Sequence, residues 1–171
     1  SLEHARRRLV DALGVEALPD AVVVHRGDLA EDKLGLGDAD YDSLGEAIDT
    51  VVHGGALLSW TLGYEHLREV NVVGTRRSLA FARHGRAKAF HHISSLAVFA
   101  GSDLDTGDYD EGVSLDRATT LYGGYAQSKW AAEALVRLAT GDETPLTVHR
   151  LGLLTAHAQS GVGPSKDGLA W

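Results

Sequence analysis

The chain has 171 residues, no cysteine and a formal net charge of −8. This length suits one domain with one core. The missing cysteines exclude disulfides and thiolate sites, and the acidic balance argues against a general nucleic-acid binder, which needs a basic face. No apolar run approaches the roughly 20 residues that span a bilayer, and nothing resembles a signal peptide; we expect a cytoplasmic protein. The sequence starts with serine and contains no methionine, so we expect a piece of something longer.

Apolar periodicity and glycine punctuation predict the following elements in chain order. They are a helix over 3–13, a strand over 21–24, a helix over 38–48, a strand over 49–59, a helix over 64–84, a strand over 87–100, a helix over 123–136 and a strand over 144–154. Each predicted strand is apolar throughout, which is typical of strands covered on both faces. The alternation predicts an α/β fold, a Rossmann-like parallel sheet with helices on both faces.

Ligands of such sheets bind beyond the carboxyl ends of the strands. The unusual residues of this sequence follow predicted strands: Asp28, Gly54-Gly55, Ser94-Ser95 and Arg150–Gly152. We therefore expect the functional site at this edge of the sheet.

Tyr125 and Lys129 lie four residues apart near the start of a predicted helix. Positions i and i+4 share one helical face, so the ammonium can stabilise a phenolate and lower the pKa of the phenol. An amphipathic helix that carries both by chance is the alternative. Ser95 makes chance less plausible, because a hydroxyl at the end of a buried strand can hydrogen-bond a substrate carbonyl in the same crevice.

Six motifs together resemble a known family. They are RGDL at 26–29, VVHGGALLSW at 51–60, EVNVVGT at 69–75, HISSLAVFA at 92–100, YAQSK at 125–129 and HRLG at 149–152. The chain resembles the extended short-chain dehydrogenase/reductases over essentially its whole length. It is most similar to the thioester reductase domains of nonribosomal peptide synthetases and carboxylic acid reductases, which are related to the fatty acyl-CoA reductases.

The resemblance implies catalytic roles for four residues. Tyr125 would be the proton donor, and Lys129 would bind the nicotinamide ribose and lower the phenol's pKa. Ser95 would orient the carbonyl; its neighbour Ser94 should face the opposite way on the strand. Asn71 would support the lysine and a proton-relay water.

The resemblance also implies a cofactor site. Its residues would be Asp28, Leu29, Gly54, Gly55, Ala56, Leu57, Asn71, Tyr125, Lys129, Leu151, Gly152 and Leu153. Asp28 would hold the adenine amino group, although an Asx turn would equally explain an aspartate there. The family usually has asparagine where Gly54 stands and proline where Leu151 stands.

A glycine-rich phosphate loop between a first strand and helix is missing from the sequence. We therefore expect residues 1–171 to form a partial NAD(P)-binding Rossmann-like domain, incomplete at the N-terminus and without most of the C-terminal substrate-binding portion. No histidine spacing indicates a metal site, since His91 and His92 are strand neighbours that point to opposite faces.

The predicted function of the parent protein is the NADPH-dependent reduction of an acyl thioester, with NADH as an alternative cofactor. The substrate would be carried on the phosphopantetheine of a carrier protein, and the product would be an aldehyde or, after a second reduction, an alcohol. Two alternatives stay open: an extended short-chain dehydrogenase that acts on a nucleotide sugar or alcohol, and a non-catalytic fragment that cannot bind cofactor.

Overall fold

The computed structural model describes residues 2–101, 110–118, 120–139, 144–154, 158, 159 and 161. The chain divides into two compact units, one formed by residues 1–27 with 153–171 and the other by residues 28–152. The second unit contains the sheet and nearly all of the predicted site.

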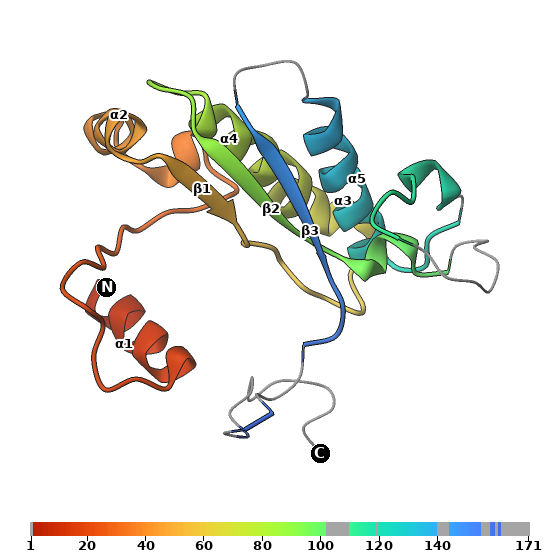
Figure 1. The fold of residues 1–171 in the computed structure, drawn as a ribbon, viewed down its shortest axis with the longest axis horizontal. Coiled ribbons are helices and arrows are strands. Elements are labelled where there is room, and N and C mark those ends of the chain that lie inside the picture. The colour runs from red at the N-terminus through yellow and green to blue at the C-terminus, as the bar shows by residue number, and fades with distance from the viewer. Residues whose placement is uncertain are drawn as a thin grey trace. The chain divides into compact units, whose positions relative to one another are not determined.

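The sheet has three parallel strands in the order β1-β2-β3 (Figure 1). Their bounds are Thr50–His53 for β1, Ala89–Ser95 for β2 and Leu146–Leu151 for β3. In the register, His53 lies beside His92 and Ser95 lies beside Leu151. The predicted α/β class with a parallel sheet is therefore confirmed.

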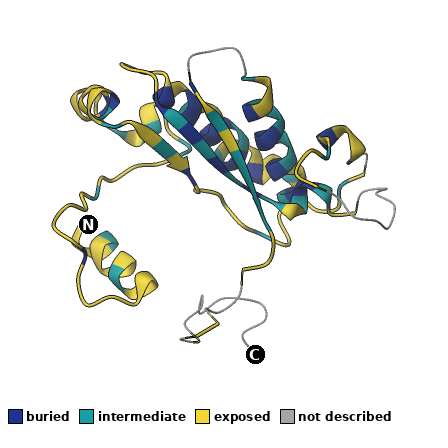
Figure 2. Ribbon diagram, in the orientation of Figure 1, coloured by how far each residue is buried: buried dark blue, intermediate teal, exposed yellow. Residues whose placement is uncertain are grey.

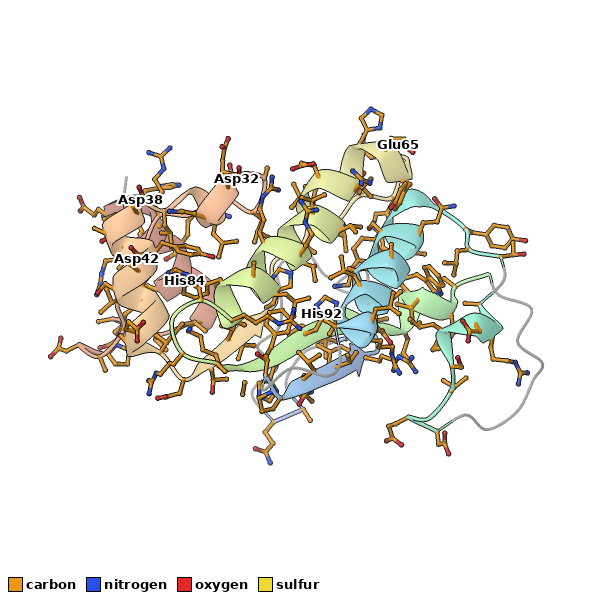
Figure 3. All side chains as sticks on the ribbon, turned by 90° about the horizontal axis from the view of Figure 1, so that it is seen from above. Asp32, Asp38, Asp42, Glu65, His84 and His92 are labelled. Atoms are coloured by element: carbon orange, nitrogen blue, oxygen red, sulfur yellow. The ribbon has the colours of Figure 1, made fainter. Side chains whose placement is uncertain are left out.

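Two helices pack side by side on one face of this sheet, α4 (Gly74–Ala82) and α5 (Gly124–Leu138) (Figure 3). Between them and the strands lies a core of Leu79, Ala82, Phe90 and Val136. The helix α2 (Asp38–Ala47) extends this layer, because Tyr41 packs edge-on against Phe81 with ring centroids 5.0 Å apart. The remaining short helices are η1 (Asp32–Gly35), η3 (Leu96–Phe99) and η4 (Leu115–Arg117).

The described helices of this unit leave the opposite face of the sheet uncovered (Figure 2), and Val52 of β1 is 66% exposed. The expected second layer of helices is not formed by the described residues of this unit. The reason is topological. Both crossovers, β1 to β2 and β2 to β3, advance in the same direction along the sheet, and right-handed crossovers that advance in one direction place their helices on one face.

The predicted helix over 64–84 is continuous but not uniform. It begins as α3 (Tyr64–Arg68), passes through a π-helical turn, η2 (Glu69–Val73), and continues as α4. A π-turn inserted in an α-helix is uncommon and is often found at functional sites. Asn71, a predicted site residue, lies in the middle of this turn.

The first unit contains the predicted N-terminal helix, α1 (Leu2–Leu13). The predicted strand over 21–24 is wrong, because this run belongs to no ladder and Val23 is 72% exposed. A strand is stable only when neighbours take up its backbone hydrogen bonds, and the described residues of this unit contain no second strand. No described helix combines the length and apolar character needed to cross a membrane.

The other predicted strands are shorter than expected. Residues 54–59 leave the sheet after His53, and Leu58 is exposed. After Ser95 the chain turns into η3, because the Ser95 hydroxyl accepts a hydrogen bond from the backbone N–H of Ala97 at 3.1 Å. The sequence stays apolar beyond the last residue of these strands, which is why the predicted strands were too long.

Candidate active site

Helix α5 supplies the tyrosine and lysine of the predicted site. Its first residue, Gly124, lies so close to Gly63 that a Cβ atom would be 2.4 Å from the Gly63 carbonyl carbon. The preceding Gly123 has a φ of 83°, a left-handed conformation that glycine adopts without strain. These two glycines fix where α5 begins and therefore where Tyr125 lies.

Lys129 is buried and reaches the central strand. Its Nζ donates a hydrogen bond to the carbonyl oxygen of Ile93 at 2.7 Å. Ile93 precedes Ser95 by two residues on β2, so the ammonium is held at the same end of the strand as the predicted hydroxyl. An ammonium has three N–H donors, and Ile93 takes one of them.

The two serines of β2 have different surroundings. Ser94 is buried under α5, and its hydroxyl donates to Glu133 Oε2 at 2.7 Å. The alternation of strand side chains predicted this difference. Ser95 is half-buried and its oxygen accepts from Ala97, so its own O–H remains able to donate to a ligand.

Asn71 connects three elements. Its Oδ1 accepts from the backbone N–H of Leu57 at 2.7 Å, and its Nδ2 donates to the Leu57 carbonyl at 3.0 Å. The same Nδ2 donates to Ser128 Oγ at 2.9 Å, and Ser128 in turn donates to the Tyr125 carbonyl at 2.8 Å. The π-turn, the segment after β1 and the first turn of α5 are thereby held together.

Leu29, a predicted cofactor residue, packs against the segment after β1 and against α4. The Leu29 side chain lies between two glycines: a Cβ on Gly55 would be 2.7 Å from Leu29 Cδ1, and one on Gly74 would be 2.9 Å from Leu29 Cβ. Asp28 is exposed and forms an Asx turn, in which its Oδ1 accepts from the Ala30 N–H at 2.8 Å.

The remaining predicted cofactor residues lie at strand ends. Residues 54–57 are exposed. A Cβ on Gly54 would meet only Ile93 Cγ1 at 3.7 Å, so steric crowding does not require glycine at position 54. Leu151 lies beside Ser95 in the ladder, and Gly152 follows it. Leu153 belongs to the other unit and is exposed.

Burial controls the ionisation of the site. It lowers the pKa of Lys129 to about 8, although the nearby Glu133 carboxylate raises it in part. Burial also raises the pKa of the Tyr125 phenol. The ammonium of Lys129 donates to the strand carbonyl of Ile93, and the lowering of the phenol's pKa by Lys129 stays a prediction.

Three buried polar residues of the quoted motifs were not predicted as site residues. His53 and His92 stack with ring centroids 5.6 Å apart, and Thr75 hydrogen-bonds His53. His92 lies beneath α4 and α5 (Figure 3). Both of its ring nitrogens are buried and lack a hydrogen-bond partner among the residues that the structure describes.

Glu133 forms a second buried polar cluster. It accepts hydrogen bonds from Ser94, from Arg137 and twice from Arg150. A glutamate on the apolar side of an amphipathic helix was the available signal for this cluster, since buried charges are normally paired.

The fold and the strand-end site define an α/β protein of the Rossmann type. The sequence profile of the NAD-binding family described as "Male sterility protein" matches residues 2–170. The chain therefore belongs to this family.

Among curated proteins, the chain is 33% identical to a non-canonical nonribosomal peptide synthetase of Cladobotryum, over 96% of this chain and 17% of that protein. It is 32% identical to L-2-aminoadipate reductase of Saccharomyces cerevisiae, over 89% of this chain and 12% of that protein. The chain thus spans only a small part of the length of these relatives.

Among solved structures, the chain resembles the terminal R domain of the myxalamid PKS-NRPS pathway, with a TM-score of 0.81 and 34% identity over 92% of this chain and 41% of that one. It also resembles the thiolation-reductase di-domain of an archaeal non-ribosomal peptide synthetase, with a TM-score of 0.72 and 27% identity over 92% of this chain and 34% of that one.

Proposed function

We propose that the protein reduces an acyl thioester, carried on the phosphopantetheine of a carrier protein, to an aldehyde with NADPH. The observation that supports this most is the attachment of Lys129 to Ile93, two residues before Ser95, from the helix that also carries Tyr125. A serine hydroxyl and a tyrosine phenol beside an ammonium would suit the polarisation of a carbonyl group. Relatives that contain R domains and a thiolation domain support the carrier-protein partner.

The residues present fit the nicotinamide half of the cofactor. Lys129 retains N–H donors for the ribose hydroxyls, and the exposed backbone of 54–57 allows close approach. Leu151 and Gly152 would border the nicotinamide. Asp28 has one carboxylate oxygen in its Asx turn, and the other would accept from the adenine amino group. The preference for NADPH over NADH and the cytoplasmic location stay predictions.

Bound NADPH would supply a hydride to the thioester carbonyl carbon. Ser95 and Tyr125 would donate hydrogen bonds to the carbonyl oxygen as negative charge develops on it. When the carbon–sulfur bond breaks, the electron pair leaves with sulfur, and Tyr125 is the acid for the proton that the thiol requires. The protonated Lys129 would stabilise the resulting phenolate. Asn71 would hold the segment 54–57 beside the first turn of α5.

The test replaces Tyr125 with phenylalanine in the full-length protein and follows NADPH consumption with a carrier-bound acyl thioester. Loss of a general acid should lower kcat by about 10²–10⁴-fold. Tyr122→Phe is the matched control, because this tyrosine lies three residues earlier and is exposed. Unchanged kcat in Tyr125→Phe would reject the mechanism. Faster turnover of a free alcohol or a nucleotide sugar than of the thioester would reject the substrate class.

A further inference from the structure

The segment 54–57 is held at both of its ends by neighbouring turns of one helix. At its far end, the Asn71 amide makes two hydrogen bonds to the backbone of Leu57. At its near end, His53, the last residue of β1, hydrogen-bonds through Nε2 to Thr75 Oγ1 at 2.9 Å. Thr75 Oγ1 also donates to the Asn71 carbonyl at 2.7 Å, so the two attachments are joined to each other.

The hydrogen-bond distances favour one tautomer of His53. Thr75 has one hydroxyl proton, and the Asn71 carbonyl accepts it. The hydroxyl oxygen must therefore accept from His53, which places the proton of the neutral imidazole on Nε2. Ser78 Oγ lies 3.3 Å from Nδ1 but donates its proton to the Gly74 carbonyl at 2.9 Å. A neutral imidazole has one N–H, and the shorter contact, to Thr75, is the one that it makes.

This chain of hydrogen bonds is shielded from water. His53, Asn71, Thr75 and Ser78 are all buried. In a buried hydrogen-bond chain, the loss of one partner leaves another polar group unsatisfied, which costs free energy. Burial also lowers the pKa of His53 to about 4, so the imidazole stays neutral and the pattern is kept at neutral pH.

We propose that Thr75 and His53 are positioning residues that fix the backbone of 54–57 for cofactor binding. The Thr75 hydroxyl links the start of this segment to the π-turn whose Asn71 side chain holds its end. The inference rests on the proposed function only in taking a nicotinamide cofactor as the ligand of this segment.

The experiment compares Thr75→Val with Thr75→Ser in the full-length protein. Valine has nearly the same shape but lacks the hydroxyl, whereas serine keeps it. Two quantities are measured: hydrogen–deuterium exchange of the peptide that contains Leu57, and the Kd for NADPH without a thioester present. We expect Thr75→Val to speed exchange at Leu57 and raise Kd, each by about tenfold, the usual effect of one lost buried hydrogen bond. Thr75→Ser should restore both values to within about twofold of the wild type.

Two further comparisons keep the test decisive. Thr144→Val is the matched control, since Thr144 is a buried threonine just before β3, and it should change neither value. If Thr75→Val does not fold, two variants of His53 replace the threonine pair. His53→Leu removes the hydrogen bond to Thr75, whereas His53→Gln retains an N–H donor near the position of Nε2.

Equal exchange at Leu57 in the wild type and the disrupting variant would overturn the inference, as would faster exchange with an unchanged Kd. Failure of the proposed function has a different signature. A wild type that binds NADPH but does not reduce the thioester would reject that function and leave the role of Thr75 standing.

Discussion

At the scale of single residues, the close approach of Gly124 to Gly63 gives a sharp prediction. A Cβ on Gly124 would lie 2.4 Å from Gly63 C and 2.5 Å from Leu62 O. Gly124→Ala must therefore move the first turn of α5 and Tyr125 with it. We expect a loss of stability of about 1–3 kcal/mol, as for other overpacked sites, and a fall in kcat of at least about tenfold, as expected for a misplaced reacting group.

The control for this prediction lies across the same contact. A Cβ on Gly63 would meet no atom within 4 Å, and its φ is −71°, so Gly63→Ala should behave like the wild type. Thermal unfolding and thioester reduction of the two variants measure the difference. Equal behaviour of Gly124→Ala and Gly63→Ala would contradict the steric argument.

The sequence predicted side-chain direction better than hydrogen-bond partners. Strand alternation separated Ser94 from Ser95, and the structure buries Ser94. The spacing of Tyr125 and Lys129 did not reveal that Lys129 would donate to the carbonyl of Ile93, 36 residues away. Local periodicity fixes the face on which a residue lies, whereas its partner depends on which strand the fold brings beneath that face.

At the scale of elements, α5 is joined to β3 by the Glu133 cluster. Arg150 of β3 donates two hydrogen bonds to Glu133 Oε1, at 3.0 and 2.8 Å, and is nearly buried. Arg137 donates one at 2.9 Å and is 43% exposed. We expect Arg150→Ala to destabilise the protein by about 3–5 kcal/mol, because it leaves a buried carboxylate poorly compensated.

Arg137→Ala is the comparison for this prediction, with an expected cost of about 0–1 kcal/mol, because Arg137 is 43% exposed and Arg150 still pairs with the carboxylate. Urea unfolding at neutral pH measures both variants. A cost for Arg137→Ala as large as that for Arg150→Ala would show that burial does not control the strength of this cluster.

Helices were easier to predict from the sequence than strand ends. The predicted helix over 38–48 corresponds to α2 within one residue, because its apolar spacing is a local signal. The strand predicted over 49–59 ends at His53, where the chain leaves the sheet although β2 continues to Ser95. The π-turn around Asn71 has no known signal in the residue spacing.

At the scale of the whole molecule, the order of the strands decides which segments pair and which face of the sheet is covered, and residue patterns alone do not show either. A continuous β-branched run at 21–24 predicted a strand, yet the described chain offers it no neighbour and Val23 is exposed. The exposed Val52 has the same origin, because crossovers that advance in one direction cover one face of a sheet. The alternation of elements identified the class of fold, but coverage of each face depends on the complete strand order.

The pH dependence of stability follows from two histidines buried beneath the helices. Burial lowers the pKa of His53 to about 4 and of His92 to about 3, with the nearby Lys129 ammonium lowering both further and Glu133 opposing the shift of His92. Between these values and 6.5, the unfolded chain binds protons that the folded chain does not. Stability must therefore fall as the pH decreases through this window. From pH 7.5 to pH 5 the expected loss is about 2 kcal/mol for each histidine.

Urea unfolding of the wild type, His92→Leu and His25→Leu at both pH values measures this loss. His92→Leu should lose about half of the pH dependence, and leucine leaves no ring nitrogens without partners at pH 7.5. His25 is exposed, so His25→Leu should retain the full dependence. A wild type equally stable at pH 5 and pH 7.5 would mean that the folded protein accepts protons on these imidazoles, which is incompatible with a closed core between β1, β2 and the two helices.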